Sequence, residues 1–150
     1  MTRNNAAMQY FDSGFDCCRA VLNSFSEVLN FSDSDMAECK ALYSILPGNP
    51  HPVCGAVRGG QKVIKLIDEQ YLQGKSRKAL EEEFRRHFYS KYKTLRCSTL
   101  IGFDVSNAQD FAEFQNYEEA ETKCRGYVSE AVNILNTMLG ITNTVESVTL

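Results

Sequence analysis

Apolar residues recur every three or four positions through most of the chain, and this periodicity constrains the fold more than any other sequence feature. It extends over several helical turns in segments 76–92 and 117–139. Such spacing places apolar side chains on one face of a helix, whereas the alternation of a half-buried strand is scarce before the C-terminal tail. The two stripes are Leu80, Phe84, Phe88 and Tyr92, and Ala120, Cys124, Val128, Ala131, Leu135, Met138 and Leu139. The sequence therefore predicts an all-α protein.

Helix start and stop signals predict the remaining elements. All three prolines fall in 47–52, a clear break between helices, and Gly102 and Gly140 mark helix ends. The connections are short, so neighbouring helices should pack antiparallel. The remaining helices are expected at 16–30, at 32–46, from Pro52 to about Tyr71, after the cap Thr94, and from Ala108. We expect one compact domain over 1–150, a bundle of about five to six helices with a frayed or loosely docked tail at 141–150.

Charge and hydropathy exclude several classes of function. The net charge of −3 gives no general attraction to nucleic acid, and the basic run near Arg85 and Arg86 is matched by Glu81 and Glu82 at helical i,i+4 spacing. No apolar run approaches the roughly 20 residues that span a bilayer, and no signal peptide is recognisable. We expect a cytoplasmic protein that binds no nucleic acid and is not membrane-inserted. A homodimer is compatible with the sequence.

Six cysteines are the residues best suited to chemistry in this chain. No Cys-x-x-Cys pair occurs, which excludes the thioredoxin motif and the usual zinc finger. Cys17, Cys54 and Cys97 each fall in the first turn of an expected helix. Unpaired backbone N–H groups and the helix dipole favour an anion there, so we expect these thiols to ionise easily.

Cys124 lies in the middle of the last helix, on its apolar stripe, and should point inward. If the three helix-initial cysteines converge on it, four sulfurs share one site suited to disulfide chemistry, a metal ion or an iron–sulfur centre. The alternative is that each is a small buried packing residue. We favour that alternative for Cys18, which fits a core stripe, and for Cys39, although periodicity does not choose between Cys17 and Cys18.

Other residues near Cys54 are candidates for the same site. Gly55 leaves the Cys54 sulfur unshielded, whereas Gly59 and Gly60 admit a second helix at close range. His51 stands three residues before Cys54 and could serve as a base or an extra ligand, although a histidine on a proline-rich loop is more often solvated. We assign Gly55, Gly59 and His51 to the binding of any cofactor.

The ordered cysteines resemble a known family. The matching segments are Gly14-Phe15-Asp16-Cys17, Cys54-Gly55-Ala56-Val57-Arg58-Gly59, Cys97 within Leu95–Gly102, and Cys124. This arrangement resembles the redox-active proteins named for the C_GCAxxG_C_C motif, over about Met8 to Leu139. Asp16 replaces the usual Asn, Cys18 replaces a common Ala, and the family's glycine-rich stretch before the second cysteine is here 45–52. The resemblance implies redox or metal chemistry without naming a substrate.

Three functional hypotheses follow. The first is a redox-active thiol protein in which Cys54 and Cys17 are exposed thiols of low pKa and Cys97 and Cys124 are their partners, with an electron partner that the sequence does not name. The second is a metal or iron–sulfur binding module with the same four ligands. The third is a helical interaction domain whose cysteines only pack. Enzymatic turnover is left open among them.

Overall fold

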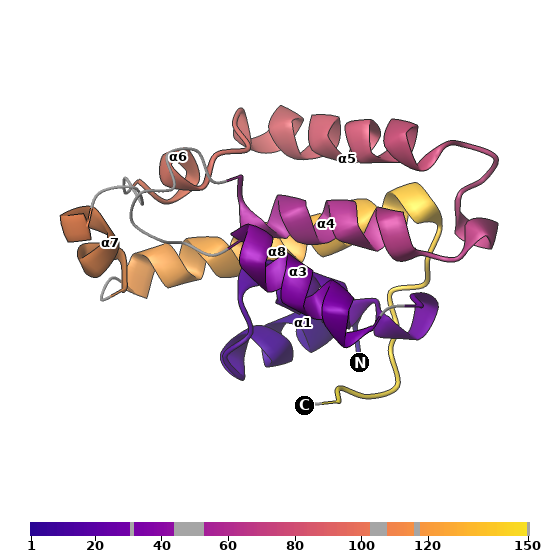
Figure 1. Ribbon diagram of the computed structural model, residues 1–150, viewed down its shortest axis with the longest axis horizontal. Coiled ribbons are helices and arrows are strands. Elements are labelled where there is room, and N and C mark those ends of the chain that lie inside the picture. Colours follow the sequence, from indigo (N-terminus) through magenta and orange to yellow (C-terminus); the bar gives the residue numbers. More distant parts are fainter. Residues whose placement is uncertain (31, 44–52, 103–107, 116–117, 150) are drawn as a thin grey trace.

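The structure, a computed structural model, describes residues 1–30, 32–43, 53–102, 108–115 and 118–149, except the side chains of 39–43, 108, 111, 114–115 and 120. These residues form helices and no named strand, which confirms the all-α class (Figure 1). The α-helices are α1 (Arg3–Asp12), α2 (Cys17–Ser24), α3 (Asp33–Tyr43), α4 (Gly55–Leu66), α5 (Arg77–Tyr92), α6 (Cys97–Ile101), α7 (Ala108–Gln115) and α8 (Glu118–Leu139). Short 3-10 helices, η1 (Ser26–Val28) and η2 (Glu69–Tyr71), follow α2 and α4.

Helix α4 is the central element and packs against α2, α3, α5 and α8. Figure 1 shows α4 beside α8, with α5 along one side of the pair and α1 and α3 on the other. Two adjacent glycines make this close packing feasible, as the sequence indicates. A Cβ on Gly59 would lie 2.7 Å from the carbonyl oxygen of Cys18 on α2, and one on Gly60 would lie 2.2 Å from the Phe84 ring on α5. Neither position has room for a side chain.

Several expected boundaries are confirmed, because local capping decides them. Asp16 caps α2 by accepting a hydrogen bond from the Arg19 N–H at 2.9 Å, and Ser76 caps α5 in the same way through Ala79. Gly102 ends α6 with a φ of +81°, where a left-handed conformation suits glycine. Helix α8 begins within one residue of the expected start.

Other boundaries differ from the expectations, because tertiary contacts decide them. Helix α1 was missed: Thr2 caps it and it buries Ala6, Ala7 and Tyr10, but its apolar face is short and interrupted by polar residues. The first expected helix, 16–30, stops at Ser24. Helix α4 does not begin at Pro52 or reach Tyr71, since isolated antiparallel bridges, Val53 to Arg96 and Leu29 to Ile67, hold both flanks in extended conformation.

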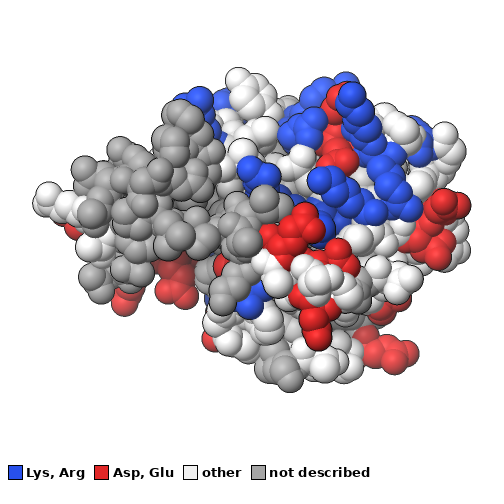
Figure 2. Space-filling model, in the orientation of Figure 1, with Lys and Arg blue, Asp and Glu red and all other residues white. Residues whose placement is uncertain are grey.

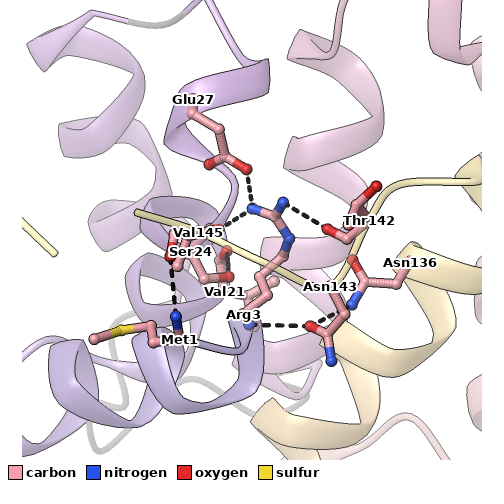
Figure 3. A network of polar contacts seen from close by, with 9 residues as sticks. All are labelled: Met1, Arg3, Val21, Ser24, Glu27, Asn136, Thr142, Asn143 and Val145. Atoms are coloured by element: carbon pink, nitrogen blue, oxygen red, sulfur yellow. Dashed lines mark hydrogen bonds and ion pairs between the residues drawn. The ribbon is translucent and has the colours of Figure 1, made fainter. Parts of the chain in front are cut away.

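Near the chain ends, the buried Arg3 side chain joins α1 to the C-terminal segment (Figure 3). Its guanidinium donates to the carbonyl oxygens of Ser24 at 2.5 Å and Thr142 at 3.1 Å, pairs with Glu27, and stacks 4.5 Å from the centre of the Phe25 ring. The Arg3 backbone N–H donates to the Asn143 side chain. These contacts define the Arg3 cluster, which consists of Arg3, Ser24, Phe25, Glu27, Thr142 and Asn143.

The segment after α8 continues this connection. The N–H groups of Met1 and Val145 each donate to the other residue's carbonyl oxygen, at 3.3 and 3.0 Å. Ile141 and Val145 are buried, and the Thr149 N–H donates to the Tyr10 hydroxyl. Residues 141–149 therefore contact α1 along its length.

Candidate thiol site

Cys54 and Cys97 are brought together by the backbone. Val53 pairs with Arg96 in an antiparallel bridge, and the Cys54 N–H donates to the Leu95 carbonyl oxygen at 2.7 Å. Cys54 is the N-cap of α4, and Cys97 is the first residue of α6. The bridge therefore places the beginnings of two helices, each with a cysteine, side by side.

Cys17 reaches the same region through α2. It is the first residue of that helix, directly after the capping Asp16, whose other oxygen pairs with the Arg19 Nε at 2.9 Å. Helix α2 lies close along α4 because Gly59 presents no side chain to it. The cap and the close approach together fix the Cys17 sulfur near α4 and α8.

Cys124 completes the group from the second turn of α8. The Cys17 thiol donates a hydrogen bond to its sulfur, and this bond lowers the pKa of Cys124 against the opposing effects of burial and of Glu121. The Cys124 thiolate therefore forms more easily than that of an unperturbed cysteine. The expectation for Cys124, an inward-pointing residue of the α8 stripe, agrees with its 5 % exposure.

Cys54 behaves in the opposite way. Burial raises its pKa strongly, and the neighbouring Cys97 and Cys124 raise it further. The backbone N–H groups of Ala56 and Val57 act against this shift, although no side-chain hydrogen bond caps the helix at Cys54. The sulfur is therefore held as a neutral thiol at neutral pH.

The expectation that Cys54 and Cys17 are exposed was therefore wrong, as was the expectation of a low pKa for Cys54. Their residues are only 3 % and 5 % exposed. At Cys54, desolvation of the charged form outweighs the favourable helix N-terminus. All four cysteines, Cys17, Cys54, Cys97 and Cys124, are buried thiols rather than disulfides. The pKa of Cys124, which the sequence assigned a partner role, is lowered.

Two tyrosines border the thiols, and sequence reasoning missed their part in the site. The rings of Tyr92 and Tyr127 meet edge to face with centroids 4.9 Å apart. Burial, followed by the proximity of Cys54 and Cys124, raises the pKa of Tyr127 to about 12. Burial also raises the pKa of Tyr92, and Cys54 contributes. The spacing of Cys124 and Tyr127, three residues apart on one helix, was the available signal.

The remaining candidates have different outcomes. Cys18 is disulfide-bonded and nearly fully buried in the core. Gly59 lies against α2 and Gly55 begins α4, so any part they play in binding a cofactor stays a prediction. His51 and the side chain of Cys39 lie outside the described residues. Within the described part of the chain, no three His, Cys, Asp or Glu residues are placed to hold a metal ion together.

The basic run on α5 is not neutralised as expected. Glu81 lies 3.9 Å from Lys65, and in the described ranges no ion pair joins Glu81 to Arg85 or Glu82 to Arg86. The expected i,i+4 pairs are therefore wrong, and Glu81 pairs instead with Lys65 on α4. Figure 2 shows Lys and Arg gathered over α4 and α5.

No helix among the described residues has the length and apolar character needed to cross a membrane.

Comparison with protein families gives a match over most of the chain. The family described as "Putative redox-active protein (C_GCAxxG_C_C)" matches residues 15–138. The chain belongs to this family. The C_GCAxxG_C_C match includes all four thiols of the site, in agreement with the resemblance noted from the sequence. No curated protein and no solved structure matches the chain.

Proposed function

We propose that the protein performs thiol–disulfide exchange at Cys17, Cys54, Cys97 and Cys124, in the cytoplasm. One observation carries the proposal: thiols from four separate elements affect one another in a single buried region. Cys17 hydrogen-bonds to Cys124, and Cys54 lies within the electrostatic influence of Cys97 and Cys124. Membership of a family described as redox-active supports the same conclusion.

The contacts favour one of the three pairings that four cysteines allow. Cys17 and Cys124 form one pair, because their side chains already share a hydrogen bond. Cys54 and Cys97 form the other, because the Val53–Arg96 bridge joins the segments that carry them. Cys124 is the attacking group of the first pair, since a thiolate is the nucleophile and its pKa is lowered.

The exchange reaction balances with a disulfide as the oxidant. The Cys124 thiolate attacks one sulfur of R–S–S–R, forming a mixed disulfide and releasing one R–S⁻. The Cys17 sulfur, after losing its proton, attacks the Cys124 sulfur and releases the second R–S⁻. The two released thiolates bind the two protons from the cysteines. The protein loses two electrons and two protons, and R–S–S–R becomes two R–SH.

The test is an equilibrium titration of anaerobically purified, reduced protein in glutathione buffers of defined potential. Acid quenching, alkylation and peptide mass spectrometry then identify the disulfides. We expect reversible formation of Cys17–Cys124 and Cys54–Cys97. In Cys17→Ser only the first should disappear, and in Cys97→Ser only the second. Four thiols that remain reduced throughout the titration, or that pair at random, would contradict the proposal.

Thiolates are soft donors for zinc and iron–sulfur clusters, so metal binding is the competing function, although no three potential ligands among the described residues are placed to hold an ion together. Metal analysis and a visible spectrum of anaerobically purified protein distinguish it. Stoichiometric zinc or iron that the wild type binds and that is lost in both Cys54→Ser and Cys124→Ser would replace the exchange proposal. Metal-free protein that reversibly forms Cys17–Cys124 and Cys54–Cys97 in the glutathione titration would support exchange.

A further inference from the structure

Helix α6 carries Cys97 but is only five residues long, Cys97 to Ile101. A helix of that length is not stable on its own, so contacts with other elements set its position. Before its first residue, the Val53–Arg96 bridge attaches the chain to the start of α4. At its far end, the Tyr127 hydroxyl on α8 donates to the Leu100 carbonyl oxygen at 2.6 Å.

The Tyr127 side chain is well suited to hold α6 in place. Its ring packs edge to face against Tyr92, at 4.9 Å, and against Phe88, at 6.3 Å between centroids. These contacts restrict the ring and thereby fix the direction of the hydroxyl. Tyr127 also lies three residues after Cys124, on the same face of α8. One helix face therefore carries a thiol of the site and the group that holds another.

We propose that Tyr127 is a positioning residue for the thiol site, whose hydrogen bond to Leu100 fixes α6 and keeps the Cys97 sulfur close to Cys54. This inference rests on the proposed thiol–disulfide function, and Tyr127 affects the thiols only through its contact with α6. Formation of a disulfide requires a narrow range of Cβ and sulfur geometry. A fixed α6 raises the effective concentration of one thiol at the other, and a loosened α6 lowers it.

The test compares Tyr127→Phe with Tyr92→Phe in the full chain. Both changes remove one hydroxyl from the same aromatic pair, but the Tyr92 hydroxyl makes no hydrogen bond among the described residues. In Tyr127→Phe, the equilibrium constant for forming Cys54–Cys97 from two thiols and oxidised glutathione should fall about fivefold, the effect of one lost hydrogen bond. The constant for Cys17–Cys124 should stay within about twofold, as should both constants in Tyr92→Phe. Equal losses at both pairs, or none, would overturn the positioning role.

A second measurement separates this inference from the proposed function. In the reduced protein, we expect N-ethylmaleimide to alkylate Cys97 several-fold faster in Tyr127→Phe than in wild type or Tyr92→Phe, with Cys17 unchanged. Should the wild type form no disulfide, the exchange proposal fails but this result still decides whether Tyr127 holds α6. An unchanged rate at Cys97 would overturn the inference and leave exchange intact.

Discussion

The thiol site and the Arg3 cluster both join segments that are far apart in the chain, but they treat buried polar groups differently. In the Arg3 cluster, the guanidinium has two carbonyl acceptors, a carboxylate and an aromatic face, and only its Nε lacks a partner among the described residues. In the thiol site, no side-chain hydrogen bond caps α4 at Cys54, and the neighbouring Cys97 and Cys124 add to the effect of burial on its thiol.

This difference separates a structural role from a chemical one. A buried charge with nearly complete hydrogen bonding resists change, since any rearrangement leaves polar groups without partners. Buried thiols lose little when they are rearranged, because sulfur is a weak hydrogen-bonding group. We therefore expect the Arg3 cluster to determine stability and the thiol site to determine reactivity, and the following experiments test that division.

Replacement of Arg3 by Met should have the largest effect on stability. The change keeps most of the side-chain volume but leaves the carbonyl oxygens of Ser24 and Thr142 without their donor. We expect a loss of about 3 kcal/mol in the free energy of unfolding, measured by urea denaturation. The alkylation rate of Cys124 should not change. Glu27→Gln is the control and should cost less than about 1 kcal/mol, because that side chain is 44 % exposed. Equal effects of the two substitutions would break the comparison.

Gly59→Ala should destabilise the protein by about 2 kcal/mol, since its Cβ would meet the Cys18 carbonyl oxygen and force α2 away from α4. The same change should slow formation of the Cys17–Cys124 disulfide, because Cys17 moves with α2. The control is Gly126→Ala on α8, where a Cβ meets nothing within 4 Å and alanine should stabilise the helix by up to about 1 kcal/mol. Thermal unfolding of both variants provides the measurement.

Alkaline pH should destabilise the protein through Cys54. Because its pKa is raised on folding, the folded state retains a proton that the unfolded state loses above a pH of about 8.5. The contribution of the protonated Cys54 thiol to the free energy of unfolding is fully present below that pH. It is lost as the pH rises, at up to about 1.4 kcal/mol per pH unit. Urea denaturation between about pH 7.5 and 10.5 should give a shallower decline in Cys54→Ala. Parallel curves for the two proteins would show that Cys54 is not desolvated as described.

The smallest effect is expected for Cys17→Ala, which removes the donor that lowers the Cys124 pKa. That pKa should rise, so the thiolate fraction at neutral pH falls and iodoacetamide should label Cys124 several-fold more slowly. The pH at which labelling reaches half its maximum rate should move upward. Cys97→Ala is the matched control, because Cys97 is not among the groups that shift the Cys124 pKa. If labelling in Cys17→Ala is unchanged or faster, the hydrogen bond does not control Cys124.

Much of the fold could be predicted from local sequence. The Asp16 and Ser76 caps, the Phe84 stripe and the end of α6 at Gly102 all follow from interactions within a few residues, so their positions were readable. Helix α1 was not, because it gains most from burial against α2 and α8 rather than from its own pattern.

The membership of the site was more predictable than its properties. Cysteine order indicated the four residues whose thiols influence one another in the structure, but not that the pKa of Cys124 is lowered and that of Cys54 raised. That depends on the desolvation of Cys54 and on the hydrogen bond from Cys17 to Cys124, and both arise from packing between elements. The Val53–Arg96 bridge likewise joins segments more than forty positions apart and leaves no periodic signal.

The hydrogen bond between Arg3 and Thr142 spans 139 positions of the chain and has a consequence for the order of assembly. Contacts of such large sequence separation form late, because the entropy of closing the intervening loop must be overcome first. We therefore expect the contacts between α1 and the C-terminal segment to form only after α8 has docked. Until then Cys17, which follows α1, remains open to oxidants and to other chains, and the six cysteines are most vulnerable to mispairing while the polypeptide is still incomplete.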